Sequence, residues 1–154
     1  MVQWRSGMQR FLALPFAEKR LLLQAAVVLA HVRWVVARQG VARFHRALAQ
    51  SDDGVVFDPA QRHRARQAAR VVRAARHLVP GHCTCLHLAL AVQQLLESRQ
   101  IAARVRIGVR KDDGEFRAHA WVQAGGEVLL GGEDCDTYCA LPLPAAWPAP
   151  GIRL

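Results

Sequence analysis

Two short stretches decide the fold of this chain: Cys85-Leu86-His87-Leu88-Ala89-Leu90-Ala91-Val92 and, about thirty residues later, Ala118-His119-Ala120-Trp121-Val122. The first is an apolar run typical of a buried helix, and the second has the composition of a strand. A thiol in the first turn of a helix lies at the positive end of the helix dipole, which favours the thiolate. An imidazole on a neighbouring strand can exchange a proton with that thiol. The pair therefore predicts a cysteine hydrolase or acyl transferase, with Cys85 as nucleophile and His119 as general base.

Helical periodicity marks three segments. Residues 17–38 are apolar on almost all sides, which indicates a helix that is buried or covered by a partner. Residues 61–78 predict a basic amphipathic helix that ends before Pro80-Gly81. Its apolar positions are Ala65, Ala68, Ala69, Val72, Ala75 and Val79. Residues 84–99 predict the most buried helix, with Thr84 as N-cap and Cys85 in the first turn.

From residue 103 the apolar period changes to two, which predicts a strand with one buried face. If Asp113-Gly114 and Gly125-Gly126 are two-residue turns, strands around 103–110, 116–123 and 127–130 form an antiparallel meander. N-terminal helices followed by such a meander make an α+β fold.

The turn lengths also predict the strand register around His119. Gly108 should lie opposite His119 on one side, and Gly132 on the other. The same register places His119 on the polar face of the sheet, away from the face that should receive the Cys85 helix. Either Cys85 approaches at an edge of the sheet, or one of the turns is longer.

The 154 residues are expected to form a single domain, with an N-terminal helical part at 1–50 and a catalytic core at 61–154. The formal charge of +9 predicts attraction to polyanions or acidic peptides. The arginines of 62–76 would suit nucleic acid, but no helix-turn-helix, zinc finger or aromatic platform accompanies them, so no nucleic-acid partner is expected. Without a phosphate-binding or dinucleotide glycine motif, no cofactor is expected either.

The apolar stretch 21–30 and its continuation are interrupted by Gln24, His31 and Arg33, and the run falls short of about 20 apolar residues. No secretory signal is recognisable at the N-terminus. We therefore expect no membrane span and a cytoplasmic location, in which most of the cysteines are free thiols.

An orienting carboxylate would hold the imidazole in the useful tautomer. The candidates after the third strand are Glu133, Asp134 and Asp136, and we choose Asp134 because the predicted register puts it diagonal to His119. A competing interpretation is a zinc-binding interaction module, because four thiolates can hold zinc, although the cysteine spacing is looser than in most such sites. The four cysteines are Cys83, Cys85, Cys135 and Cys139.

Taken together, the motifs Cys85-Leu86-x-x-Ala89-Leu90-Ala91 and Ala118-His119-Ala120-Trp121-Val122, with Val79-Pro80 before them, resemble the transglutaminase-like leader peptidases of lasso-peptide biosynthesis. The opening Phe11-Leu12-Ala13-Leu14-Pro15 is similar to the start of those proteins as well. The resemblance implies a papain-like or transglutaminase-like fold and a cytoplasmic cysteine protease that removes the leader from a ribosomally made precursor.

The resemblance matches Cys85 to the family nucleophile and His119 to its general base. It implies three partners: the precursor peptide, a separate leader-recognition protein and an ATP-consuming ring-closing ligase. Many members have an Asp at the position that Gly131 occupies here, so the third catalytic residue is open. An inactive transglutaminase-like scaffold is the second alternative function.

Overall fold

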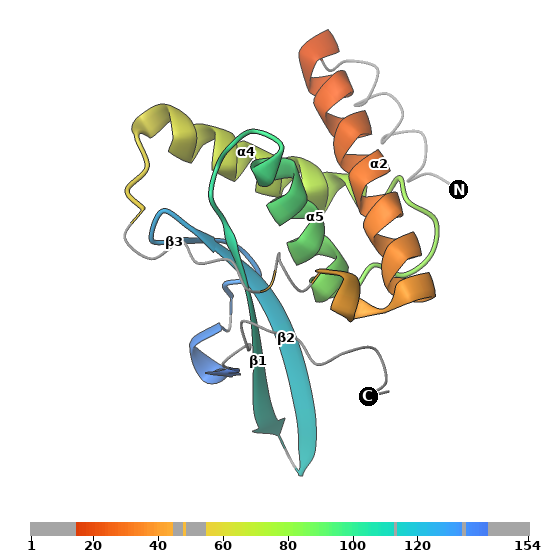
Figure 1. Ribbon diagram of the computed structural model, residues 1–154, viewed down its shortest axis with the longest axis vertical. Coiled ribbons are helices and arrows are strands. Elements are labelled where there is room, and N and C mark those ends of the chain that lie inside the picture. Colours follow the sequence, from red (N-terminus) through yellow and green to blue (C-terminus); the bar gives the residue numbers. More distant parts are fainter. Residues whose placement is uncertain (1–14, 45–47, 49–54, 113, 134, 142–154) are drawn as a thin grey trace, which may run out of the picture.

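The structure, a computed structural model, describes residues 15–44, 48, 55–112, 114–133 and 135–141. Helices precede strands in the described chain (Figure 1). The helices are α2 (Phe16–Gln39), α4 (Pro59–Ala75) and α5 (Cys85–Glu97), with short 3-10 turns η1 (Val41–Phe44) and η2 (Cys135–Thr137). The strands are β1 (Arg104–Asp112), β2 (Glu115–Ala124), β3 (Glu127–Leu130) and β4 (Cys139–Ala140). The predicted α+β arrangement of helices followed by an antiparallel sheet is confirmed.

Helix α2 buries one stripe of its surface and exposes another. The buried stripe is Ala25, Leu29, Val32 and Val35, and it packs against α4 and α5. By length and composition α2 is apolar enough to cross a membrane, a test that core helices also pass. The helix was expected to be buried or covered by a partner; burial within the chain accounts for one stripe only, because large apolar side chains remain exposed on the other. These are Phe16, Leu23, Val27 and Trp34.

Helix α4 begins with a capping box. The Asp58 side chain accepts from the Gln61 backbone N–H, and the Gln61 side-chain oxygen accepts from the Asp58 backbone N–H. Its buried residues are Ala65, Ala68, Ala69, Val72 and Ala75, as the periodicity predicted. Two of its arginines bind one carboxylate of β3: Glu127 lies 3.0 Å from Arg62 and 2.8 Å from Arg66. Part of the basic face is therefore used to hold α4 against the sheet.

The sheet has the order β3-β2-β1-β4. In the β1–β2 hairpin Asp112 pairs with Glu115 and Gly108 pairs with His119, as predicted from the two-residue turn. Short β4 was not predicted; it pairs with β1 at Gly108 and Val109. One face of the sheet packs against α5, and the buried side chains between them include Leu90, Val105 and Val122.

The predicted pairing of Gly132 with His119 is wrong. A β-bulge between Val122 and Gln123 shifts the register, so that Leu130 rather than residue 129 lies opposite Val122. Strand β3 ends at Leu130. In the described residues, the β2 edge beside His119 is therefore left without a β3 partner.

Candidate active site

The first turn of α5 fixes Cys85. Thr84 is the N-cap: its hydroxyl accepts from the His87 backbone N–H at 3.4 Å, while the His87 Nδ1 accepts from the Thr84 backbone N–H at 3.1 Å. This reciprocal capping box places Cys85 at the first helical position, where backbone N–H groups lack helical partners. The Cys85 thiol is free and half-buried. Its position at the positive end of a helix is the one that the sequence predicted.

The environment of His87 disfavours the protonated form of its ring. Burial, followed by the nearby charges of Arg33 and His82, lowers the pKa of His87 below its ordinary value of 6.5. A neutral ring can offer a bare Nδ1 to the Thr84 N–H, whereas an imidazolium cannot. The capping box and the lowered pKa therefore support each other.

The loop that leads into α5 is held by α2. The Arg33 guanidinium donates to the Pro80 carbonyl oxygen and lies against Gly81. Gly81 has φ +88°, and a Cβ there would meet the guanidinium at 2.6 Å. The Arg33 guanidinium thus occupies the space that a side chain at position 81 would need. Through this contact Arg33 joins α2 to the loop before the helix that carries Cys85.

His119 is held by a backbone contact and by aromatic rings. Its Nε2 lies 2.9 Å from the Gly131 carbonyl oxygen. The imidazole stacks on Trp121, with centroids 6.2 Å apart, and tilts against Tyr138, with centroids 5.3 Å apart. Gly108, opposite His119 on β1, leaves space for the Trp121 and Tyr138 side chains. A Cβ at this position would lie 2.8 Å from the Trp121 ring and 2.9 Å from the Tyr138 Cβ.

Tyr138 is a contact residue that the sequence reasoning missed. It lies between η2 and β4, and the Arg110 guanidinium sits over its ring at 4.9 Å. It is the single tyrosine of the chain and follows the predicted third strand closely. This position was the one feature of the sequence that could have suggested a role for it near His119. The pairing of β4 with β1 brings it to His119, and that pairing was not visible in the sequence pattern.

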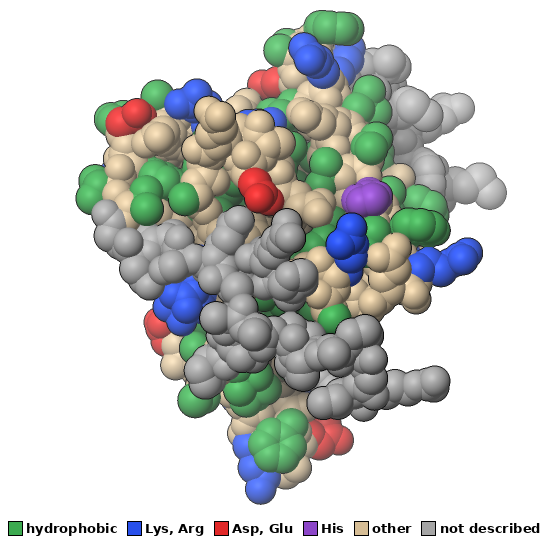
Figure 2. Space-filling model, viewed as in Figure 1, with side chains coloured by type: hydrophobic (Ala, Val, Ile, Leu, Met, Phe, Trp, Pro, Cys, Tyr) green, Lys and Arg blue, Asp and Glu red, His purple; other side chains and the backbone are tan. Residues whose placement is uncertain are grey.

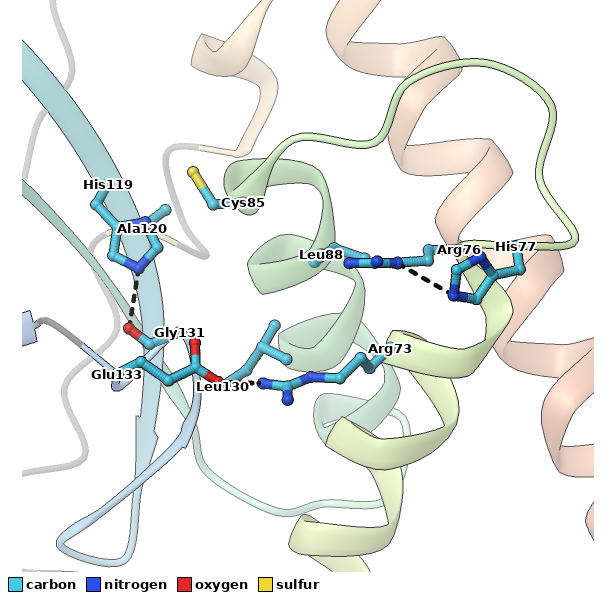
Figure 3. A pocket seen from close by; sticks show the side chains of 10 residues that line it. All are labelled: Arg73, Arg76, His77, Cys85, Leu88, His119, Ala120, Leu130, Gly131 and Glu133. Atoms are coloured by element: carbon cyan, nitrogen blue, oxygen red, sulfur yellow. Dashed lines mark hydrogen bonds and ion pairs between the residues drawn. The ribbon is translucent and has the colours of Figure 1, made fainter.

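Cys85 and His119 line the same cavity of about 410 Å³ (Figure 3). In Figure 3 the Cys85 side chain extends from the start of α5 toward the side of the cavity where the His119 ring lies. Ala120, Leu130 and Gly131 complete that side of the cavity. Both residues line this cavity beside the edge of β2 that β3 leaves open, which corresponds to the edge approach, one of the two alternatives expected from the sequence.

The C-terminal part of α4 and the residues after it form a basic wall of this cavity. The lining residues there are Arg73, Arg76 and His77. Arg73 is paired with Glu133 at 3.4 Å, and both side chains are more than half exposed, so the pair is weak. The two arginines of this wall carry positive charge beside Cys85, and Glu133, which also lines the cavity, offsets part of it.

The predicted orienting carboxylates do not contact His119 in the described residues. Asp134, our choice, lies outside them. Glu133 pairs with Arg73, and Asp136 accepts from the Cys135 thiol at 3.7 Å. In the described part of the chain, the hydrogen-bond partner of the imidazole is the backbone of Gly131.

The competing zinc interpretation finds no support in the geometry. All four cysteines are described and are free thiols. Among the described residues, no cluster of three or more His, Cys, Asp or Glu side chains has the geometry to hold a metal ion. A four-cysteine centre would need all four sulfurs around one point, and the described residues do not provide one. The zinc-binding alternative is therefore wrong.

Comparison with known proteins identifies the family of the chain. A family model described as the transglutaminase-like superfamily matches residues 26–141, which include Cys85 and His119. The microcin J25-processing protein McjB of Escherichia coli is 27% identical over 111 residues, which are 72% of this chain and 50% of that protein. The chain thus spans about half the length of this curated relative. No solved structure matches the chain significantly. The chain belongs to the transglutaminase-like superfamily.

Proposed function

We propose that this protein is a cysteine protease that removes the leader peptide from a ribosomally synthesised lasso-peptide precursor. The observation that carries the proposal is the shared cavity, in which a thiol at a helix N-terminus and a strand imidazole line one open space. Membership of the superfamily and similarity to a protein named for microcin processing support it. The proposed location is the cytoplasm, where the precursor is made.

In the proposed reaction the Cys85 thiol gives its proton to His119, and the sulfur attacks the carbonyl carbon of the scissile peptide bond. The backbone N–H groups of the first turn of α5 are available to stabilise the oxyanion that develops. The imidazolium then protonates the departing amine, which leaves with the core peptide. Water hydrolyses the resulting thioester, which releases the leader and restores the thiol.

The cavity wall indicates the kind of peptide that this site favours. Arg73 and Arg76 lie on the α4 side of the cavity, and the whole chain carries a formal charge of +9. A leader with acidic side chains near the cut would find complementary charge there. The proposed substrate is therefore a flexible peptide with carboxylates close to the cleavage point.

The exposed stripe of α2 supports docking of a separate leader-recognition protein. Phe16, Leu23, Val27 and Trp34 recur at steps of seven, four and seven residues, which puts them on one side of the helix. Figure 2 shows several hydrophobic side chains, interspersed with basic ones, along the part of the surface that α2 forms. Such a stripe is typical of a helix that binds a partner. The ring-closing ligase is the proposed consumer of the released core peptide.

The test is cleavage of a candidate precursor in the presence of the recognition protein, read by mass spectrometry. Wild type should give leader and core fragments, while Cys85→Ala should give none above background. Cys83→Ala is the matched control, because Cys83 is a half-buried free thiol two positions away, outside the helix. The proposal is wrong if Cys85→Ala cuts like wild type, or if wild type with its partner leaves the precursor whole.

One observation favours a second candidate, an inactive scaffold: Gly131 stands where the resembling peptidases often have Asp. A scaffold needs no activated thiol, so iodoacetamide should then alkylate Cys85 no faster than Cys83. The protease proposal predicts the opposite order. Peptide mapping after a short exposure separates the two candidates.

A further inference from the structure

The contact between His119 and Gly131 fixes the tautomer of the imidazole. The Nε2 atom lies 2.9 Å from the Gly131 carbonyl oxygen, and a carbonyl oxygen can only accept a hydrogen bond. Nε2 must therefore carry a hydrogen. A neutral imidazole has a single N–H, so Nδ1 is left with a bare lone pair.

The bare nitrogen is on the side of the imidazole that is turned toward Cys85, in the cavity that both residues line. In Figure 3 the ring nitrogen that is hydrogen-bonded to Gly131 points away from Cys85, and the other ring nitrogen lies on the side turned toward Cys85. The Trp121 ring, stacked on the imidazole, and the Tyr138 ring, tilted against it, limit rotation of the imidazole. The carbonyl thus selects the tautomer, and the rings hold its orientation.

The position of this carbonyl depends on the absence of a side chain at Gly131. Its φ is +75°, in the left-handed region that glycine adopts without strain. A Cβ there would lie 2.9 Å from the Ala120 carbonyl oxygen and 3.1 Å from the His119 Nε2. Any side chain would push the ring or the carbonyl away.

We propose that the main-chain carbonyl of Gly131 orients His119 in place of the carboxylate expected in this family. This inference rests on the proposed function for its meaning, since it names how the base of that reaction is held. The thiol proton passes to Nδ1, Nε2–H keeps donating to Gly131 throughout, and the same Nδ1 proton later goes to the leaving amine. Gly131 is a positioning residue, because it acts only through the imidazole.

The same geometry argues against the nearby carboxylates. The single Nε2–H is already donated to Gly131. A carboxylate from Asp134 has no second hydrogen to accept at Nε2. Glu133 is engaged with Arg73, and Asp136 with Cys135. Orientation by one of these groups would require the Gly131 contact to break.

The first experiment reads the tautomer of the full chain without substrate. Protein labelled with ¹⁵N at histidine is examined by NMR above the titration range of imidazole, and the His119 signal is assigned with His119→Gln. The expected result is a protonated Nε2 and a bare Nδ1. A protonated Nδ1 overturns the inference, whether or not the protein cleaves a precursor.

The second experiment measures the pH profile of Cys85 alkylation by iodoacetamide, with peptide mapping to separate the four cysteines. Gly131→Ala should slow Cys85 by between about 10- and 100-fold, because misplacement of a catalytic group costs that much. Gly126→Ala is the matched control: Gly126 has φ +77°, but a Cβ there meets nothing within 4 Å. Equal slowing in both variants reduces the effect to backbone strain and overturns the inference.

The third comparison covers the competing carboxylates, and it keeps the inference testable even if Gly131→Ala misfolds. Glu133→Gln, Asp134→Asn and Asp136→Asn should each retain the alkylation rate within about twofold, with an unchanged pH profile. A loss of tenfold or more with a shifted profile in one of them assigns the orienting role to that carboxylate. Because alkylation needs no precursor, failure of the inference here is distinguishable from failure of the protease proposal in the cleavage assay.

Discussion

Protonation of His87 should weaken the N-terminus of the helix that carries Cys85. The His87 Nδ1 accepts from the Thr84 N–H at 3.1 Å, and protonation converts this acceptor into a donor. The cation would also stand at the positive end of α5 and near Arg33. Acid should therefore remove one half of the capping box.

The sign follows from the lowered pKa of His87. Because burial, Arg33 and His82 hold it below 6.5 in the folded protein, the unfolded chain binds this proton first as the pH falls. The contribution to stability is complete above pH 6.5 and is lost as the pH falls toward the folded-state pKa. Loss of a cap costs about 1 kcal/mol, which is a roughly fivefold change in the unfolding equilibrium.

The control is built into the same chain. Helix α4 begins with an equivalent capping box in which Gln61 plays the part of His87. His87→Gln should keep the acceptor at every pH, so its stability should match wild type at pH 8 and exceed it by about 1 kcal/mol at pH 5. Urea unfolding followed by tryptophan fluorescence at both pH values measures the difference, in which the other histidines cancel.

A constant difference between wild type and His87→Gln from pH 8 to pH 5 would refute this reasoning. So would a loss of more than about 1 kcal/mol in the variant at pH 8, because the ring would then contribute packing rather than capping. Thr84→Ala provides the upper bound, since it removes the cap hydroxyl at all pH values. The stability lost in Thr84→Ala should not follow the pH dependence that is expected for the difference between wild type and His87→Gln.

Three further outcomes are expected. Gly108→Val should cost about 1–3 kcal/mol in urea unfolding and slow Cys85 alkylation, because even its Cβ would meet the Trp121 ring at 2.8 Å; unchanged values would show that the aromatic rings have room to move. Glu127→Gln should cost below about 1 kcal/mol, and the loss should shrink in high salt, because the two arginines of α4 that it binds are partly exposed. Val27→Asp should weaken binding of the leader-recognition protein in calorimetry without lowering the melting temperature, since Val27 is 69% exposed; undiminished binding would place the docking surface elsewhere.

Elements whose signals are local were predictable from the sequence. The helix over 84–99 was placed by its apolar run and by Thr84, and α5 is observed from Cys85 to Glu97. The hairpin register followed from turn length alone, which was enough to match Gly108 to His119. Caps, turns and periodicity act within a few residues, and a single sequence displays them directly.

Features that depend on contacts between distant segments were not predictable. The bulge inserts one residue, Leu129, into β3 opposite Val122 and Gln123, and nothing in the β3 sequence marks that residue as the extra one. Strand β4 has two residues and forms only because β1 offers an edge. Both errors fell at the site: the first misplaced Gly132 beside His119, and the second hid Tyr138.

The bulge and the early end of β3 also resolve the question that the sequence left open, namely how Cys85 can reach His119. His119 belongs to the face of β2 opposite α5, yet it shares a cavity with Cys85. The bulge and the early end of β3 remove the strand that would otherwise cover the edge of β2, and the chain turns at Gly131 so that its carbonyl meets the imidazole. An unbulged β3 that continued past Leu130 would have closed this edge and separated thiol from base. Deletion of Leu129, the extra residue of the bulge, should restore regular pairing of β3 with β2 and close the open edge beside His119. It should therefore slow alkylation of Cys85 by iodoacetamide more than it lowers the free energy of unfolding in urea.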